Sequence, residues 1–134
     1  MRHLLALALF LGGCPNSGLD SAGDSSGDSG ADTCDSVQDR GTALRSANQG
    51  CTAAVGCEIV SNYEIAGENN CLGAFQCADA YPTGADRTQL AADAVALSDE
   101  ARACGTCMDD VACEDPTKVV AVCNETTGLC EVGG

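Results

Sequence analysis

Eleven cysteines in a chain of 134 residues constrain this protein more than any other feature of its sequence. After residue 13 the aromatic residues are only Tyr63, Phe75 and Tyr81, and the chain has no tryptophan, so a core of large side chains is thin. A disulfide stabilises a fold by about 2–4 kcal/mol, chiefly by restricting the unfolded chain. The composition therefore predicts a small domain that depends on its cross-links.

The first 13 residues have the layout of a secretory signal peptide. Met1–His3 carries positive charge, Leu4–Leu11 is an unbroken apolar run, and two glycines stand before Cys14. Eight apolar residues are far fewer than the roughly 20 that a membrane-spanning helix needs. We therefore expect residues 1–13 to direct export and to be removed.

The four residues Leu11-Gly12-Gly13-Cys14 resemble the lipobox of bacterial lipoproteins. In that family the cysteine receives a diacylglyceryl group, becomes the new N-terminus after cleavage and carries several acyl chains. Two or more acyl chains anchor a protein stably, whereas one binds only marginally. The resemblance implies a Cys14 lipid anchor in the bacterial cell envelope. Because Pro15 rather than aspartate follows Cys14, it also implies the outer membrane.

Lipidation of Cys14 bears on the cysteine count. An odd number of cysteines in an exported protein raises the question of a free thiol. With Cys14 on a lipid, ten cysteines remain, the number that five structural disulfides need. Their pairing cannot be deduced from sequence. These ten are Cys34, Cys51, Cys57, Cys71, Cys77, Cys104, Cys107, Cys113, Cys123 and Cys130.

Residues 14–33 form the lipidated cysteine and an acidic tether. The segment is almost entirely Ser, Gly, Asp, Ala and Asn, so it buries too little apolar area to order itself, and its like charges extend it. Calcium binding is the alternative, but a calcium loop needs alternating oxygens and a closing glutamate, which this segment lacks. We expect a disordered tether here and a cysteine-rich domain over residues 34–134.

Within that domain the first half predicts one helix and one strand. Asp35 or Ser36 is a candidate cap for a helix that runs through Asn48. Glu58–Ile65 has the composition of a strand. Residues 69–73, with two asparagines and a glycine, predict a loop.

The second half predicts a stronger helix and a hairpin. Asp86 with Gln89 matches a capping box, and Gly105 ends the helix. We expect its small alanines to pack closely against a sheet. Its apolar stripe is Leu90, Ala94, Leu97, Ala101 and Cys104.

Residues 118–123 and 129–132 are mostly apolar and flank the turn-like segment 124–128, which predicts a β-hairpin. We expect at least one disulfide to tie this hairpin to the Cys51–Cys57 region. The predicted class is a small disulfide-rich α+β domain: a short antiparallel sheet with one or two helices, preceded by the tether.

The chemistry open to this chain is narrow. His3 is the only histidine and leaves with the signal, so the mature chain has no Ser-His-Asp triad, no Cys-His dyad and no histidine metal ligand. The pairs Asp99-Glu100, Asp109-Asp110 and Glu114-Asp115 are interpreted as solvated charge. A net charge of -14 opposes binding to nucleic acid.

Cys104-Gly105-Thr106-Cys107 is a C-x-x-C motif, which is found in thiol–disulfide enzymes and at zinc sites. Here the motif follows a helix, whereas in thioredoxin-like enzymes it opens one, and an exported chain with an even cysteine count favours disulfides over zinc. Met108 stands where haem attachment needs a histidine. We therefore expect no cofactor and no metal.

From Cys51 to Val132 the cysteine spacing, with a C-x5-C, a C-x2-C and a terminal A-x-C and G-x-C, resembles small cysteine-rich lipoproteins of some Gram-negative bacteria. That resemblance implies a location and a style of fold, and no catalytic residues. The leading hypothesis is a non-catalytic surface, binding or structural module with an unknown partner. The alternatives are a redox protein that uses Cys104 and Cys107, and a protease inhibitor with Pro82–Arg87 as its exposed loop.

Overall fold

A computed structural model describes residues 29–134 of the chain. The predicted signal peptide, Cys14 and most of the predicted tether lie outside these residues. The predicted fold class, a small disulfide-rich α+β domain with antiparallel strands, is confirmed. Its elements are α1 (Ser29–Ala47), β1 (Cys57–Val60), α2 (Asn62–Ala66), the 3-10 helix η1 (Gly73–Phe75), β2 (Asp79–Pro82), α3 (Thr88–Ala103), β3 (Val120–Asn124) and β4 (Leu129–Gly133).

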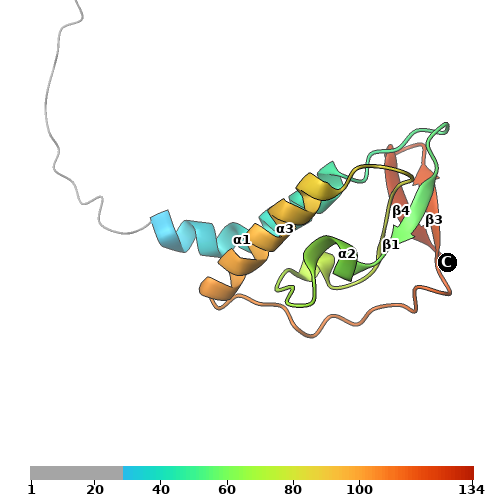
Figure 1. Cartoon of the computed structure of the whole chain (residues 1–134). Coiled ribbons are helices and arrows are strands. Elements are labelled where there is room, and N and C mark those ends of the chain that lie inside the picture. The colour runs from blue at the N-terminus through green and yellow to red at the C-terminus, as the bar shows by residue number, and fades with distance from the viewer. Residues whose placement is uncertain (1–28) are drawn as a thin grey trace, which may run out of the picture.

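The helices gather at one end of the domain and the strands at the other (Figure 1). α1 and α3 lie side by side and run in opposite directions, since Cys34 near the start of α1 is bonded to Cys104 just after α3. After α3 the chain returns along the outside of the domain to β3. The two long helices therefore form one layer, and α2 lies between them and the strands.

The predicted apolar stripe of α3 is confirmed, but the surface it packs against differs from the prediction. Leu90, Ala94 and Ala101 are buried, and α3 packs mainly against α1 and α2. On α1, Gly41 packs against Leu72, the residue before η1, and an added Cβ there would lie 3.4 Å from a methyl group of Leu72. Small residues thus serve helix–helix packing here.

The helix boundaries are partly as expected. α1 begins at Ser29, before the predicted caps Asp35 and Ser36, so the end of the segment assigned to the tether is helical. At α3 the Asp86 carboxylate accepts hydrogen bonds from the Thr88 amide at 2.9 Å and hydroxyl at 2.7 Å. Gln89 bonds to Asp93 instead of closing a capping box. Gly105, with φ of 68°, follows the helix end as predicted.

The strands form two separate antiparallel pairs. β1 pairs with β2, and β3 pairs with β4 in the predicted hairpin. The predicted strand Glu58–Ile65 is correct only as far as Val60. Beyond it the Ser61 side chain accepts a hydrogen bond from the Tyr63 amide and caps α2, because a hydroxyl at that position satisfies an amide that the helix leaves unpaired.

Residues 49–51 connect the two strand pairs. The Cys130 amide donates to the Gln49 carbonyl at 2.7 Å, and the Cys51 amide donates to the Gly128 carbonyl at 2.8 Å, so this segment lies along β4. The buried Gln49 side chain donates to the Ala80 carbonyl on β2 at 3.0 Å. A single residue therefore holds both sheets by hydrogen bonds.

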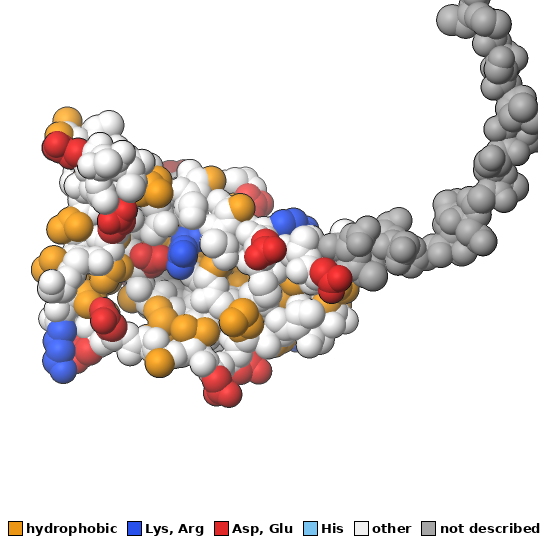
Figure 2. Space-filling model, turned by 180° about the vertical axis from the view of Figure 1, so that it is seen from behind, with side chains coloured by type: hydrophobic (Ala, Val, Ile, Leu, Met, Phe, Trp, Pro, Cys, Tyr) orange, Lys and Arg blue, Asp and Glu red, His pale blue; other side chains and the backbone are white. Residues whose placement is uncertain are grey.

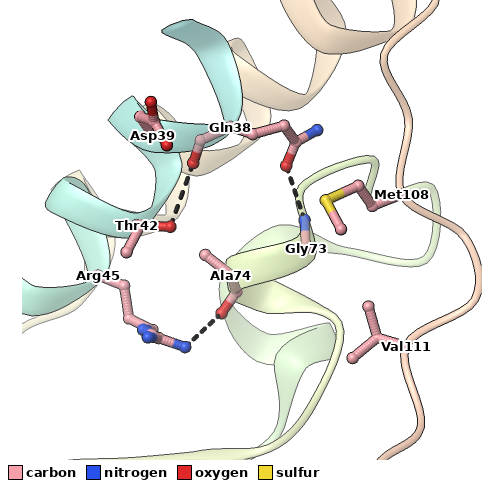
Figure 3. A pocket seen from close by; sticks show the side chains of 8 residues that line it. All are labelled: Gln38, Asp39, Thr42, Arg45, Gly73, Ala74, Met108 and Val111. Atoms are coloured by element: carbon pink, nitrogen blue, oxygen red, sulfur yellow. Dashed lines mark hydrogen bonds between the residues drawn. The ribbon is translucent and has the colours of Figure 1, made fainter.

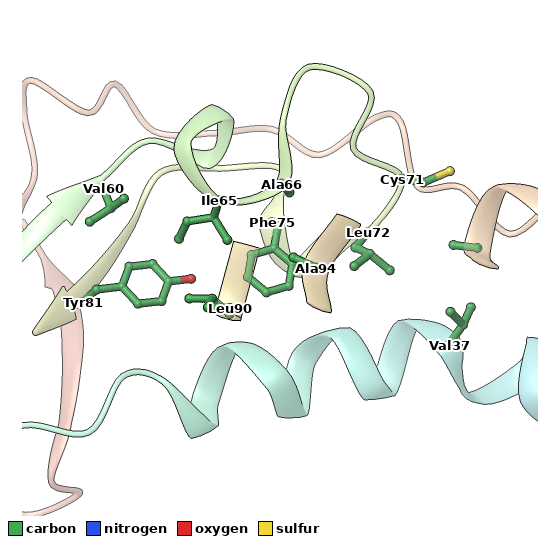
Figure 4. Packing of buried hydrophobic residues seen from close by; sticks show 11 residues of the cluster. Val37, Val60, Ile65, Ala66, Cys71, Leu72, Phe75, Tyr81, Leu90 and Ala94 are labelled. Atoms are coloured by element: carbon green, nitrogen blue, oxygen red, sulfur yellow. The ribbon is translucent and has the colours of Figure 1, made fainter. Parts of the chain in front are cut away.

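The hydrophobic core lies between the helices and reaches the first sheet. Figure 4 shows Tyr81, Leu90, Phe75 and Leu72 in a row along α1. Ser98 is the polar residue beside it: its hydroxyl accepts from the Cys71 amide at 2.7 Å. The core cluster consists of Val37, Val60, Ile65, Ala66, Cys71, Leu72, Phe75, Tyr81, Leu90, Ala94 and Ala101.

Within residues 29–134 we find no helix with the length and hydrophobicity needed to span a bilayer.

Candidate functional site

All ten cysteines of the described chain are paired in five disulfides. Each bridge spans a long stretch of chain, from 36 to 73 residues. A bridge that closes a long loop removes much conformational freedom from the unfolded chain, so this framework is suited to stabilising a thin core. The pairs are Cys34–Cys104, Cys51–Cys123, Cys57–Cys130, Cys71–Cys107 and Cys77–Cys113.

Two of these bridges tie the C-terminal hairpin to the Cys51–Cys57 region, as predicted. Cys51 is bonded to Cys123 on β3, and Cys57 is bonded to Cys130 on β4. The Sγ atoms of Cys51, Cys57 and Cys123 all lie within 4.8 Å of one another although they belong to two different bridges. We call the four cysteines of these two bridges, Cys51, Cys57, Cys123 and Cys130, the inter-sheet cysteine cluster.

The C-x-x-C motif is divided between two bridges. Cys104 is bonded to Cys34 on α1, and Cys107 is bonded to the buried Cys71. The two cysteines of the motif are therefore not the vicinal pair that a thioredoxin-like enzyme oxidises and reduces. Each instead joins the end of α3 to a different part of the helical layer.

The first pocket, of about 400 Å³, lies between α1, η1 and the chain that follows Cys107 (Figure 3). Met108 and Val111 form its apolar side and are both exposed. On its polar side the Arg45 guanidinium donates to the Ala74 carbonyl at 3.3 Å and lies 3.4 Å from the Asp79 carboxylate. Arg45, the one cationic side chain that lines this pocket, thus already has partners within the domain.

Gln38 uses its whole side-chain amide to join three segments beside this pocket. Its Nε2 donates to the carbonyls of Cys71 and Thr106, at 3.0 and 2.7 Å. Its Oε1 accepts from the Gly73 amide at 3.0 Å. Because every hydrogen-bonding atom of this side chain has a partner, we assign Gln38 a structural role.

We expect Gln38→Ala to lower the free energy of unfolding by about 1–3 kcal/mol, because it leaves partly buried backbone groups without partners. Urea unfolding of the oxidised protein measures the change. Thr42→Ala, one turn along α1, is the control: the exposed Thr42 hydroxyl bonds only within its own helix, so its loss should change stability by less than about 0.5 kcal/mol. Equal losses in the two variants would contradict the role assigned to Gln38.

A second pocket of about 400 Å³ lies between β1, α2 and the Cys77–Cys113 bridge. Its apolar wall includes Ile59, Pro116 and Tyr63, a residue that is 64% exposed. Glu64 and Glu114 are its charged residues. An exposed aromatic ring with carboxylates around it is a surface suited to binding a group with an apolar body and a positive charge.

Three titratable groups of the described residues have pKa values shifted by their surroundings. Burial raises the pKa of the Tyr81 phenol far above its ordinary value, and the Asp79 carboxylate adds to the rise, so Tyr81 stays neutral. Hydrogen bonds from Thr88 lower the pKa of the exposed Asp86, and hydrogen bonds from Thr117 lower that of the exposed Asp115. The shifts at Asp86 and Asp115 thus come from hydrogen bonds to residues two positions further along the chain.

Of the three carboxylate pairs, Glu114 and Asp115 line one pocket together with Lys118. Asp99 pairs with Arg102 on its own helix, whereas Glu100 pairs with Arg40 on α1. Asp115 lies 3.4 Å from the Lys118 ammonium. Neighbouring carboxylates thus have separate partners, and Asp109 and Asp110 are simply exposed.

The segment Pro82–Arg87, the candidate inhibitory loop, is held at both ends. Arg87 donates to the Glu58 carboxylate at 3.1 Å, and the Gly84 amide donates to the same carboxylate at 3.3 Å. Only residues 83–86 are exposed. The basic side chain that a trypsin-like protease would need is therefore tied back to β1.

No family model, no curated protein and no solved structure matches this chain.

Proposed function

We propose that this protein is a lipid-anchored, non-catalytic module of the bacterial cell envelope, with a disulfide-stapled domain for binding or for a structural role. The observation that carries the proposal is the use of the cysteines. Ten of the eleven are bonded to one another. Cys14 is the one left over, and it stands where the lipobox resemblance puts the acylated residue.

The electrostatics support a solvated surface. On the face seen in Figure 2, carboxylates are spread over the whole domain rather than gathered in one patch. With a net charge of -14, such a surface repels nucleic acid and anionic lipid headgroups and favours solvation. The partner in this proposal is therefore a protein or another surface component. The lipid on Cys14 alone holds the protein at the membrane.

The side chains also support a role without catalysis. After His3 the sequence offers no imidazole. In the described residues the thiols are all bonded, and the buried Tyr81 is held neutral. Among the described residues, the Thr88 and Thr117 hydroxyls donate to the Asp86 and Asp115 carboxylates. These contacts are exposed and join residues two apart in the chain, so we assign them to turns rather than to the nucleophile and base of covalent catalysis. The pocket beside the exposed Tyr63, between β1, α2 and the Cys77–Cys113 bridge, is the best candidate surface for contact with a partner.

Cys14→Ser tests the anchor. Expressed in a Gram-negative bacterium with labelled palmitate, the unchanged chain should carry label and fractionate with membranes, because stable anchoring needs two or more acyl chains. The variant should carry no label. Thr33→Ser, which leaves Cys14 in place, is the control and should be labelled like the unchanged chain. Equal labelling of the Cys14 variant, or an unlabelled parent, would contradict the proposal.

A further inference from the structure

The inter-sheet cysteine cluster holds two bridges whose sulfurs are neighbours. In most proteins a disulfide has only its own partner sulfur nearby. Here Cys57 Sγ lies within 4.8 Å of both Cys51 Sγ and Cys123 Sγ, although it is bonded to Cys130. Among residues 29–134 no other group of three cysteines is this close. A thiolate released from one bridge is thus already beside the other.

The same four cysteines also fit a second pairing. Cys123 and Cys130 are directly opposite in the β3–β4 register. The Cys130 amide donates to Gln49 on the far side of β4, so Cys123 and Cys130 are a non-hydrogen-bonded pair, the kind in which Cα atoms lie about 4.5 Å apart. That separation falls within the range that a disulfide can bridge.

Cys51 and Cys57 are close for a different reason. Between them the chain makes a tight turn, in which the Val55 amide donates to the Thr52 carbonyl at 2.9 Å. The turn brings the chain back so that both Sγ atoms meet at the cluster. The two Sγ atoms therefore lie within 4.8 Å of each other before any exchange.

We propose that the inter-sheet cysteine cluster is a thiol–disulfide exchange site, at which a small thiol converts Cys51–Cys123 and Cys57–Cys130 into Cys51–Cys57 and Cys123–Cys130. The thiol enters at the Cys51–Cys123 bridge. Both residues of this bridge are half-buried, whereas in the other bridge only Cys57 is half-buried and Cys130 is 1% exposed.

The steps balance without an oxidant. An external thiolate attacks Cys123 Sγ, forms a mixed disulfide and expels Cys51 as a thiolate. Cys51 then attacks Cys57 Sγ, forms the Cys51–Cys57 bond and expels Cys130 as a thiolate. Cys130 attacks Cys123 Sγ in the mixed disulfide, forms the Cys123–Cys130 bond and returns the external thiolate. Two disulfides are present before and after, so nothing is oxidised or reduced.

The exchange changes how the hairpin is held. In the observed pairing, two bridges fasten β3 and β4 to the turn around residues 51–57. In the exchanged pairing each bridge lies within its own segment. The hairpin then stays in place only through packing, through hydrogen bonds such as Cys130 to Gln49, and through the main chain at Lys118. A passing thiol thereby releases one end of the domain. This inference does not rest on the proposed membrane anchor.

Tryptic peptides report the exchange directly. Cleavage after Arg45, Arg87 and Lys118 places Cys51 and Cys57 in one peptide, 46–87, and Cys123 and Cys130 in another, 119–134. The oxidised protein is incubated with reduced glutathione without oxygen, alkylated, denatured, digested without reductant and weighed by mass spectrometry. We expect free peptide 119–134, unalkylated and two hydrogens lighter than its dithiol form. Peptide 119–134 that stays linked to 46–87, or that is released with alkylated cysteines, would overturn the proposal.

Two double variants separate exchange from simple reduction. Cys51→Ser with Cys123→Ser removes the internal nucleophile, so at the same glutathione concentration peptide 119–134 should remain linked through Cys57–Cys130. Cys77→Ser with Cys113→Ser removes an exposed bridge outside the cluster and should still release the bridged peptide. Release from the first variant would mean direct reduction of Cys57–Cys130 and would also overturn the proposal.

Discussion

Replacing Cys51 and Cys123 with alanine, and then Cys57 and Cys130 as well, is expected to lower the free energy of unfolding in two unequal steps. While Cys57–Cys130 remains, the first bridge closes only the short loop made by residues 51–57 and 123–130. A loop of about 15 residues corresponds to about 3 kcal/mol. Removing the second bridge then opens the loop made by residues 57–77 and 113–130, because the Cys77–Cys113 bridge remains. A loop of about 39 residues corresponds to about 4 kcal/mol.

Urea unfolding under non-reducing conditions, followed by far-UV circular dichroism, measures both steps. The slope of the unfolding free energy against urea should also rise, because the unfolded chain expands once the long loop opens. Amide exchange should show lost protection in β3 and β4 before α1 and α3. Val55→Ala, an exposed change in the same turn, is the control and should stay within about 0.5 kcal/mol. An unchanged midpoint after the second step would contradict the account of the cluster as the clamp between the sheets.

Phe75→Ala is expected to cost about 3–5 kcal/mol, the range for truncating a buried aromatic residue. Phe75 is 2% exposed and is the one phenylalanine in the described domain. It contacts the core from η1, between α1 and α3, where Leu72 and Leu90 lie beside it. With so few large side chains in the core, its neighbours cannot fill the cavity that alanine leaves.

Tyr63→Ala is the matched aromatic control, since Tyr63 is 64% exposed. Its removal should change the unfolding free energy by less than about 0.5 kcal/mol. Both variants keep all five bridges, so the unfolded states are comparable. Similar losses in Phe75→Ala and Tyr63→Ala, measured by urea unfolding, would show that the disulfides rather than the core carry the fold.

The parts of the fold that were predictable depend on local pattern. The apolar stripe from Leu90 to Ala101 has the helical period, and two β-branched segments with a turn between them make the β3–β4 hairpin. A missed signal was also local: Ser61-Asn62-Tyr63-Glu64 has the S-x-x-E spacing of a capping box. The β-branched residues around it predicted a strand, but β1 ends at Val60 and Ser61 caps α2.

What could not be predicted depends on contacts between distant segments. Nothing local to Asp79–Pro82 indicates that it pairs with β1, because 18 residues and two short helices intervene. α3 packs on α1 and α2, and α1 lies far from it in the sequence. Ten cysteines allow hundreds of pairings, and only the fold decides among them. In the fold Cys104 and Cys107 belong to two different bridges, although the C-x-x-C motif alone suggests a pair.

The intact mass of the mature protein, purified from bacterial membranes without reductant, tests the central claim most directly. The account predicts a polypeptide that begins at Cys14, carries acyl groups on that residue, and is ten hydrogens lighter than the fully reduced chain because of its five disulfides. A chain that keeps residues 1–13, an unmodified Cys14, or a deficit smaller than ten hydrogens would contradict it.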